Sequence, residues 1–289
     1  MLSGYISAVI TPFKNNEVDL VAFEKYISYL INSGISGIVV CGSTGESLSL
    51  SFEEKVKLLK IAFEINNGKT KIIGGIIDSS TNNCLELMKK TEKYVDNFLC
   101  ICPFYVKPSQ QQIYEHFKRL SENTSKGIII YNNPQRVGTD IGFDTFQKLC
   151  AIKNIVAIKE CSNILSRFSL WRKDVKEEFS FLSGNDDTAC AALAMGANGI
   201  ISVTANIAPT LSSKMYKAFF QNSIEKFCIL RDILAPLHEL MFAEPSPAPL
   251  KYALSRAGLI ANELRNPLSQ ISPDLQKKID NFMEKQEIT

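Results

Sequence analysis

Short apolar runs alternate with longer amphipathic segments over the first 220 residues of the chain. The runs are continuously apolar, which is typical of parallel strands that are buried on both faces. The amphipathic segments between them predict helices. Eight strands are predicted, over residues 5–11, 37–42, 71–77, 97–102, 127–131, 154–159, 179–184 and 199–203.

Residues with clear capping preferences mark the ends of several predicted helices. Ser51 with Glu54, and Ser109 with Gln112, have the spacing of a capping box. Gly34 follows the first predicted helix and favours its termination there. Eight strands alternating with helices over about 220 residues predict an α/β fold, a (β/α)8 TIM barrel. An open doubly wound sheet is the alternative, but the early G-x-G-x-x-G fingerprint of that fold is missing from the sequence.

The last part of the chain has no strand pattern. Three helical segments are predicted there, over 224–242, 247–260 and 272–285. Ser272 followed by Pro273 is typical of a helix start. We therefore expect a catalytic barrel over 1–221 and a C-terminal helical appendage over 222–289, packed on the barrel.

Composition and charge exclude several classes of protein. The 289 residues carry a net charge of +2, from 32 basic and 30 acidic side chains, so no positive excess favours nucleic acid or a membrane surface. Apolar runs are too short to span a membrane, and the first residues lack the basic region of a signal peptide. Eight cysteines without a C-x-x-C pair indicate reduced thiols in the core of a cytoplasmic protein. The two histidines, His116 and His238, have no metal-ligand spacing, so neither a metal site nor a Ser-His-Asp relay is expected.

Candidate chemistry follows the predicted strands, because the active site of such a barrel lies at the carboxyl ends of its strands. The loop GSTGES after the second strand offers the hydroxyls of Ser43 and Thr44 and suits a carboxylate or phosphate, although a plain tight turn gives the same motif. The fourth strand is followed by Tyr105. The fifth ends at Tyr131 and is followed by Arg136.

A lysine ends the sixth predicted strand. Poor solvation at that place should lower the pKa of Lys159 and free its amine to attack a carbonyl. A lysine that merely extends to the solvated rim of the barrel is the alternative. The two tyrosines and the hydroxyl loop on neighbouring strand ends favour Schiff-base chemistry, since phenols can move the protons that it requires.

Eight sequence blocks in order resemble one family. They are AVITPF, GSTGES, PFYVKPSQ, YNNPQRVG, AIKE, SGND, GIISVTAN and EPSPAPLKYALSRAGL. In these blocks the chain is similar to the pyruvate-dependent class I aldolases and lyases that include dihydrodipicolinate synthase and N-acetylneuraminate lyase. Arg136 in YNNPQRVG places the resemblance closest to the synthases, because sialic-acid-type members have no arginine there.

The resemblance implies a role for each catalytic candidate. Lys159 forms an imine with pyruvate, and Tyr131 moves protons as that imine forms. Ser43 takes the middle place of a Tyr–Thr–Tyr proton relay, where most synthases have threonine. Tyr105 is the second phenol, and in the family it extends across a tight dimer interface. Thr44 holds the carboxylate of pyruvate.

The resemblance also implies the second substrate, the assembly and the cofactor requirement. Arg136 binds the carboxylate of L-aspartate 4-semialdehyde, and Gly184 and Ile201 contribute pocket backbone. The expected reaction belongs to lysine and diaminopimelate biosynthesis. The covalent pyruvate imine makes a separate cofactor unnecessary. A homotetramer built from tight dimers is expected.

Three other functions remain open at this point. The nearest is another Schiff-base 2-oxo-acid aldolase, resembling N-acetylneuraminate lyase or a 2-keto-3-deoxy sugar acid aldolase. A catalytically silent binding homologue and a phosphate-binding barrel enzyme are the others. The phosphate-binding enzyme should carry a second glycine-rich loop after the last two strands, and neither SGND nor SVTAN resembles one.

Lysine-inhibited members of the family bind lysine at the dimer interface through a glutamate, histidines and a tyrosine. The resemblance places Asn82, Phe52, Lys55 and Phe104 at the corresponding positions here. Loss of the anion and gain of a cation should weaken the binding of lysine. Asp78, near the same loop, could supply an anion instead.

Overall fold

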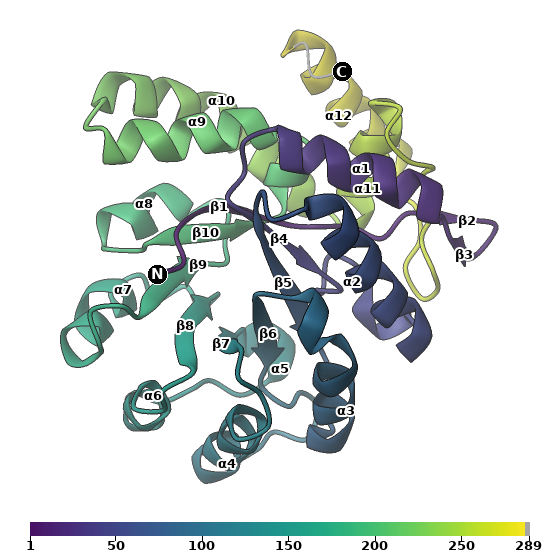
Figure 1. Cartoon of the computed structure of the whole chain (residues 1–289). Coiled ribbons are helices and arrows are strands. Elements are labelled where there is room, and N and C mark those ends of the chain that lie inside the picture. Colours follow the sequence, from purple (N-terminus) through teal and green to yellow (C-terminus); the bar gives the residue numbers. More distant parts are fainter. Residues whose placement is uncertain (287–289) are drawn as a thin grey trace.

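A closed barrel of eight parallel strands forms the centre of the molecule (Figure 1). The computed structural model describes residues 1–286. All eight predicted strands are present and neighbours along the chain are neighbours in the barrel, which confirms the (β/α)8 fold. The barrel strands are β1 (Gly4–Ala8), β4 (Gly37–Val40), β5 (Lys71–Ile76), β6 (Asn97–Ile101), β7 (Gly127–Asn132), β8 (Ile155–Glu160), β9 (Ser180–Ser183) and β10 (Gly199–Ser202).

Burial of both strand faces explains the continuous apolar runs. Every residue of β1, β4, β9 and β10 is buried, with one face in the barrel and the other under the helices. The first strand ends at Ala8, earlier than the apolar run to 11 suggested. Val9 and Ile10 are buried nonetheless, so hydrophobicity there reports burial rather than strand pairing.

Helices surround the barrel and begin where their capping residues predict. The Ser51–Glu54 and Ser109–Gln112 capping boxes are both formed. Gly34 follows the first helix in the left-handed conformation that glycine adopts easily. The helices up to residue 220 are α1 (Leu20–Asn32), α2 (Phe52–Asn66), α3 (Thr81–Thr91), α4 (Gln110–Ser121), α5 (Pro134–Val137), α6 (Phe143–Cys150), α7 (Arg167–Leu170), α8 (Ala189–Ala194) and α9 (Pro209–Phe220).

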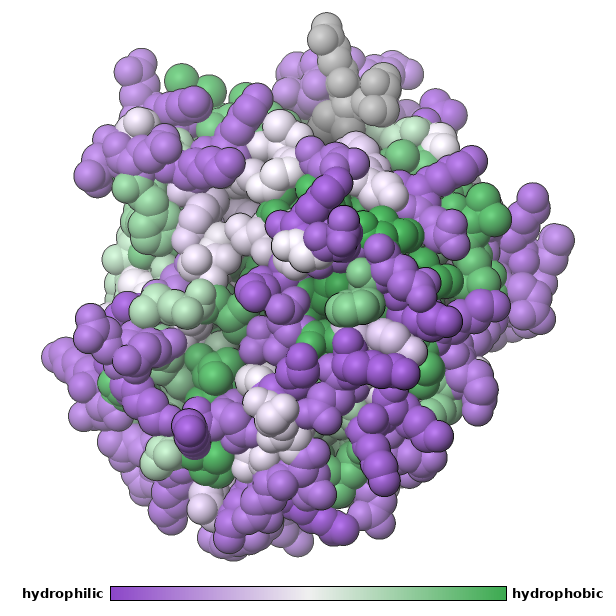
Figure 2. All heavy atoms as spheres, viewed as in Figure 1, coloured by the Kyte–Doolittle hydropathy of each residue, from purple (hydrophilic) through white to green (hydrophobic). Residues whose placement is uncertain are grey.

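Polar side chains cover most of the outer rim of the molecule, and hydrophobic ones are visible between the elements towards its middle (Figure 2). This arrangement follows from the amphipathic pattern of the outer helices. In α4, for example, Ile113, Phe117 and Leu120 are fully buried while the opposite face is polar.

A small hairpin lies outside the barrel and was missed by the sequence analysis. It pairs β2 (Phe13–Lys14) with β3 (Glu17–Val18) through Asn15 and Asn16, both at positive φ. Two-residue hairpin turns require that conformation, and asparagine tolerates it better than most residues. The dipeptide Asn15-Asn16 was therefore the sequence feature that could have predicted this hairpin turn.

The C-terminal region contains the three predicted helices. They are α10 (Ile224–Phe242), α11 (Ala248–Arg256) and α12 (Pro273–Lys285), with Ser272 capping α12 as predicted. Helix α10 packs against α9 and also contacts α11 and α12 (Figure 1). The division into units 1–221 and 222–289 stays a prediction.

Buried thiols are a feature of this fold. All eight cysteines lie within the described residues and are free, and six of them are buried, which confirms the prediction of reduced core thiols. Among residues 1–286, no helix is long and apolar enough to cross a membrane.

A fully buried ion pair joins the C-terminal region to the loop after β4. Lys251 Nζ lies 2.5 Å from Glu46 Oε1, and neither side chain is exposed. The ammonium also donates to the Glu263 carbonyl at 2.8 Å and lies 4.0 Å from the centre of the Phe13 ring. Burial lowers the pKa of Lys251 to about 8, although Glu46 opposes that shift.

Removing the cation of this pair should strongly destabilise the protein. A buried charge left without its partner typically costs about 3–5 kcal/mol, so Lys251→Ala should lower the free energy of unfolding by that amount. Urea denaturation followed by circular dichroism measures it. The control is Arg256→Ala, which removes an exposed ion pair to Asp280 and should cost less than about 1 kcal/mol. Equal losses in the two variants would contradict the importance of burial.

Candidate active site

A cavity of about 660 Å³ opens at the carboxyl ends of the barrel strands. Six of the eight predicted site residues line it, although they come from widely separated parts of the chain. These residues are Ser43, Thr44, Tyr131, Arg136, Lys159 and Gly184.

Lys159 and Tyr131 are direct neighbours. They are paired in register at the ends of β8 and β7, and both are almost completely buried. Lys159 Nζ lies 4.3 Å from the centre of the Tyr131 ring, where an ammonium interacts favourably with the aromatic face. Asn133 Nδ2 donates to the Tyr131 hydroxyl at 3.3 Å. The phenol is therefore held beside the amine.

The expected fall in the pKa of Lys159 is wrong. Burial lowers the pKa, but electrostatic interactions with Tyr131, Cys161 and Asp186 raise it more. The pKa of Lys159 consequently lies above its ordinary value. The environment therefore favours the ammonium form, which must lose a proton before the amine can attack a carbonyl.

Gly184 allows the end of β9 to approach the lysine. A Cβ at this position would lie 2.1 Å from Cys161 Sγ and 2.7 Å from Lys159 Cε. Any larger residue would displace one of these two side chains. Glycine at position 184 thus leaves space in the cavity around the Lys159 side chain.

The loop after β4 is both a tight turn and a wall of the cavity. The Gly45 amide donates to the Gly42 carbonyl at 3.1 Å, and the Thr11 hydroxyl donates to the Gly45 carbonyl at 2.7 Å. Glu46 has a left-handed backbone and is fixed by Lys251. The backbone of the turn that carries Ser43 and Thr44 is therefore held in place by the fold itself.

Arg136 enters the cavity from the one-turn helix α5. Asn133 caps this helix by accepting the Arg136 amide through Oδ1 at 3.2 Å, and Gly138 ends it at φ +77°. Arg136 and Ser43 also line an adjoining cavity of about 340 Å³ that Phe104 shares. The guanidinium thus lies where the two cavities meet.

Two predicted site residues do not line the main cavity. Tyr105 is 91% exposed, at φ +71°, on the loop after β6. Ile201 is buried within β10, in register with Ile6, and Val203 lines the cavity in its place. Within this chain, the structure therefore leaves the second phenol outside the site.

Comparison with known proteins agrees with this geometry. The model of the "Dihydrodipicolinate synthetase family" matches residues 1–286. The chain belongs to this family. A 4-hydroxy-tetrahydrodipicolinate synthase of Rickettsia typhi is 39% identical over 98% of this chain and 97% of the relative.

Solved structures of family members have the same fold. Dihydrodipicolinate synthase from Aquifex aeolicus superposes with a TM-score of 0.97, at 35% identity over 99% of both chains. The enzyme from Acinetobacter baumannii, complexed with pyruvate, superposes with a TM-score of 0.96, at 33% identity over all of both chains.

The sequence analysis missed an acidic wall of the cavity. Asp186, Asp187 and Glu239 line it, together with His238. Asp186 is held by the Thr204 amide at 3.0 Å, and His238 Nδ1 lies 2.9 Å from the Thr204 hydroxyl. The SGND motif contained one signal, Asp186. The α10 residues gave none, because no sequence pattern places that helix at the mouth of the barrel.

Among residues 1–286, no group of three or more His, Cys, Asp or Glu side chains is placed to hold a metal ion.

Of the four positions expected to correspond to the family's lysine site, only two line the same cavity. Phe52, Lys55 and Asp78 line one cavity of about 410 Å³, with Asn83 rather than Asn82. Asn82 instead accepts a hydrogen bond from Arg119 outside this cavity. Phe104 lines the adjoining cavity next to Arg136 instead.

The anions of this cavity are engaged or exposed. Asp78 Oδ1 accepts the Ser80 amide at 2.7 Å, and Oδ2 accepts Asn83 Nδ2 at 3.2 Å. Glu53 and Glu86 also line the cavity, but both are exposed to solvent, which weakens their attraction for a cation. Lys55 is half-buried among them.

We expect free lysine to inhibit weakly or not at all. Lys55 repels both ammonium groups of the ligand, and Asn83 offers only an uncharged amide. Calorimetric titration beside an inhibition curve measures the affinity. Asn83→Glu combined with Lys55→Ala should increase that affinity by at least tenfold, about 1.4 kcal/mol. Half-inhibition of the unmodified enzyme at low-millimolar lysine or below would contradict the prediction.

Proposed function

We propose that this chain is a 4-hydroxy-tetrahydrodipicolinate synthase, which condenses pyruvate with L-aspartate 4-semialdehyde. The observation that carries the proposal is a buried lysine paired in register with a tyrosine, in a cavity that also holds Arg136. Relatives of that name, at up to 40% identity over nearly the whole chain, support it.

The first step is formation of an imine. The Lys159 amine, once deprotonated, attacks the keto carbon of pyruvate, and loss of water leaves a protonated imine. Because the pKa of Lys159 lies above its ordinary value, a neighbouring group must take the ammonium proton. The Tyr131 hydroxyl beside it gives its own proton to the departing hydroxyl, which leaves as water, and takes up the ammonium proton in exchange.

The second step forms the carbon–carbon bond. The imine gives a methyl proton to the Tyr131–Ser43 relay and becomes an enamine. The terminal carbon of the enamine attacks the aldehyde, whose oxygen takes a proton back from the relay, and the amino group of the second substrate then displaces Lys159 from the imine as the ring closes. Thr44 and the turn amides hold the carboxylate of pyruvate, and the Ser43 hydroxyl relays protons from Tyr131. Serine lacks the methyl group that restricts a threonine side chain, so this relay is less rigid. Gly184 leaves room for the imine, and Ile201 contributes backbone at the strand end.

The charges around the cavity support an amino-acid aldehyde as the second substrate. Arg136 binds a carboxylate in a forked, charge-assisted contact. Across the cavity, Asp186, Asp187 and Glu239 favour a substrate ammonium group. Aspartate semialdehyde carries both charges, whereas a sugar acid carries hydroxyl groups and no ammonium in that place.

The exposed position of Tyr105 supports assembly with a second copy of the chain. Tyr105 and Val106 project from the loop after β6, at 91% and 63% exposure. In the proposed tight dimer this tyrosine completes the relay of the neighbouring site, and two dimers form a homotetramer. The imine serves in place of a cofactor. Eight free thiols support a cytoplasmic location.

Lys159 should be the only lysine that forms an adduct with pyruvate. Borohydride reduction in the presence of pyruvate, followed by peptide mass spectrometry, should place one adduct on the peptide containing Lys159. Lys159→Arg should be almost inactive, because a guanidinium stays protonated. The control is Lys153→Arg, in the turn just before β8, which should keep full activity. An adduct on another lysine would refute the proposed chemistry.

Arg136 should select an aldehyde that bears a carboxylate. Arg136→Ala should raise KM for aspartate semialdehyde at least tenfold, because loss of one partner of such a contact costs about 2–5 kcal/mol. Borohydride trapping of pyruvate on Lys159 should remain within about twofold of the unmodified enzyme. Steady-state assays with both aldehyde classes measure the preference. Normal kinetics in the variant, or preference of the unmodified enzyme for a sugar acid, would contradict the synthase function.

A further inference from the structure

Behind the reactive pair lies a second, fully buried polar pair. Successive residues of a strand face opposite sides, so Asn132 and Glu160 point away from the cavity that Tyr131 and Lys159 line. They are paired in register one step further along the same two strands. Asn132 Nδ2 donates to Glu160 Oε2 at 3.0 Å, and both side chains are buried.

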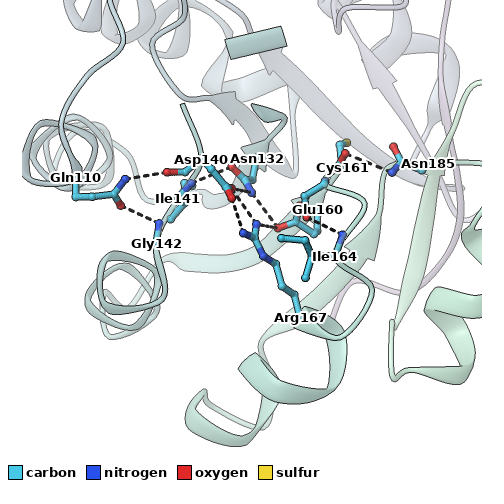
Figure 3. Close-up of polar contacts among 11 residues, drawn as sticks. Gln110, Asn132, Asp140, Ile141, Gly142, Glu160, Cys161, Ile164, Arg167 and Asn185 are labelled. Carbon is cyan, nitrogen blue, oxygen red and sulfur yellow. Dashed lines mark hydrogen bonds and ion pairs between the residues drawn. The ribbon is translucent and has the colours of Figure 1, made fainter. Parts of the chain in front are cut away.

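Arg167 joins this inner pair to a more distant carboxylate. Its Nη1 donates to Glu160 Oε2 at 3.3 Å and to Asp140 Oδ1 at 2.9 Å, while Nη2 donates to Asp140 Oδ2. The guanidinium lies 4.6 Å from the centre of the Trp171 ring and its side chain is only 11% exposed. Figure 3 shows Arg167 between the two acids. A single cation thus holds together the end of β8 and the segment after α5.

The same network fixes both ends of the segment that carries Arg136. Asn132, at its start, donates through Nδ2 to Asp140 Oδ1 at 2.9 Å and accepts the Ile141 amide through Oδ1 at 3.3 Å. Gln110 of α4 accepts the Gly142 amide and donates to the Asp140 carbonyl, both at 2.8 Å (Figure 3). Residues 133–140 therefore form a loop whose two ends meet on buried polar groups.

We propose that Arg167 is a positioning residue for the second substrate. By clamping Asp140 to Glu160, it sets the place of Arg136 relative to Lys159, although it touches neither cavity nor substrate. This inference rests on the proposed role of Arg136 in binding the aldehyde. The bidentate contact between the shielded Arg167 guanidinium and the half-buried Asp140 makes this clamp geometrically specific, and a lysine ammonium could not reproduce it.

Asp140→Asn tests the clamp with little change of volume. Its amide cannot accept both guanidinium hydrogen bonds, so the Arg136 segment should loosen while the Asn132–Glu160 pair stays. KM for aspartate semialdehyde should rise about tenfold, and borohydride trapping of pyruvate on Lys159 should stay within about twofold. Arg167→Lys should give a similar split. Arg172→Lys is the control, since the hydrogen bonds that Arg172 makes within residues 1–286 go to Gly196 and Asn198.

A double-mutant cycle separates positioning from general destabilisation. If Asp140 acts through Arg136, adding Asp140→Asn to Arg136→Ala should raise KM no further. Additive effects, or KM values within twofold of the unmodified enzyme in both Asp140→Asn and Arg167→Lys, would overturn the proposal. A matching loss in pyruvate trapping and thermal stability would also overturn it, because that pattern marks a merely structural role.

Hydrogen exchange tests the clamp independently of the substrate. In Asp140→Asn, amides of 133–141 should exchange at least tenfold faster, while those of β8 keep their rates. Unchanged exchange in 133–141 refutes the clamp. If the unmodified enzyme does not turn over aspartate semialdehyde, the proposed function fails, and the exchange experiment still decides whether Arg167 fixes this segment.

Discussion

Closure of the barrel is the constraint on which the site depends. Eight parallel strands joined edge to edge bring all their carboxyl ends into one ring. Side chains that are far apart in sequence then come into direct contact. The Lys159 ammonium, for example, lies 4.3 Å from the centre of the Tyr131 ring. The strand register also decides which of two successive polar residues faces the cavity and which is buried behind it. Lys159 therefore lines the cavity, whereas Glu160, the next residue in the sequence, is buried behind it and pairs with Asn132.

The sequence predicted the fold well because the barrel strands are largely buried on both faces and several helices begin at residues with clear capping preferences. The apolar run 127–131 became β7, and Ser109 with Gln112 opened α4. The site followed the same logic, since a barrel concentrates chemistry in the residues after each strand. Thr44, Arg136 and Lys159 could be found in this way.

The rest depended on contacts that no local pattern contains. The direction of the pKa shift of Lys159 is set by Tyr131, Cys161 and Asp186, whose combined effect exceeds that of burial. His238 and Glu239 line the cavity because the C-terminal half of α10 packs beside it. The 91% exposure of the Tyr105 side chain is that of a single chain without a second copy beside it. Local sequence patterns indicate which residue types are present, but the distances between their side chains depend on how separate elements pack.

The buried contact between Glu46 and Lys251 has a consequence for how the protein is made. Its two residues are separated by about 200 positions, so the contact forms only after most of the chain has left the ribosome. A nascent chain that already contains GSTGES has no cation for Glu46, so this end of the turn lacks its ion pair until α11 has been made. The loop that carries Ser43 and Thr44 therefore reaches its final set of contacts late, although it is synthesised early. Any chain that stops before α11 would have a barrel sequence without a finished site.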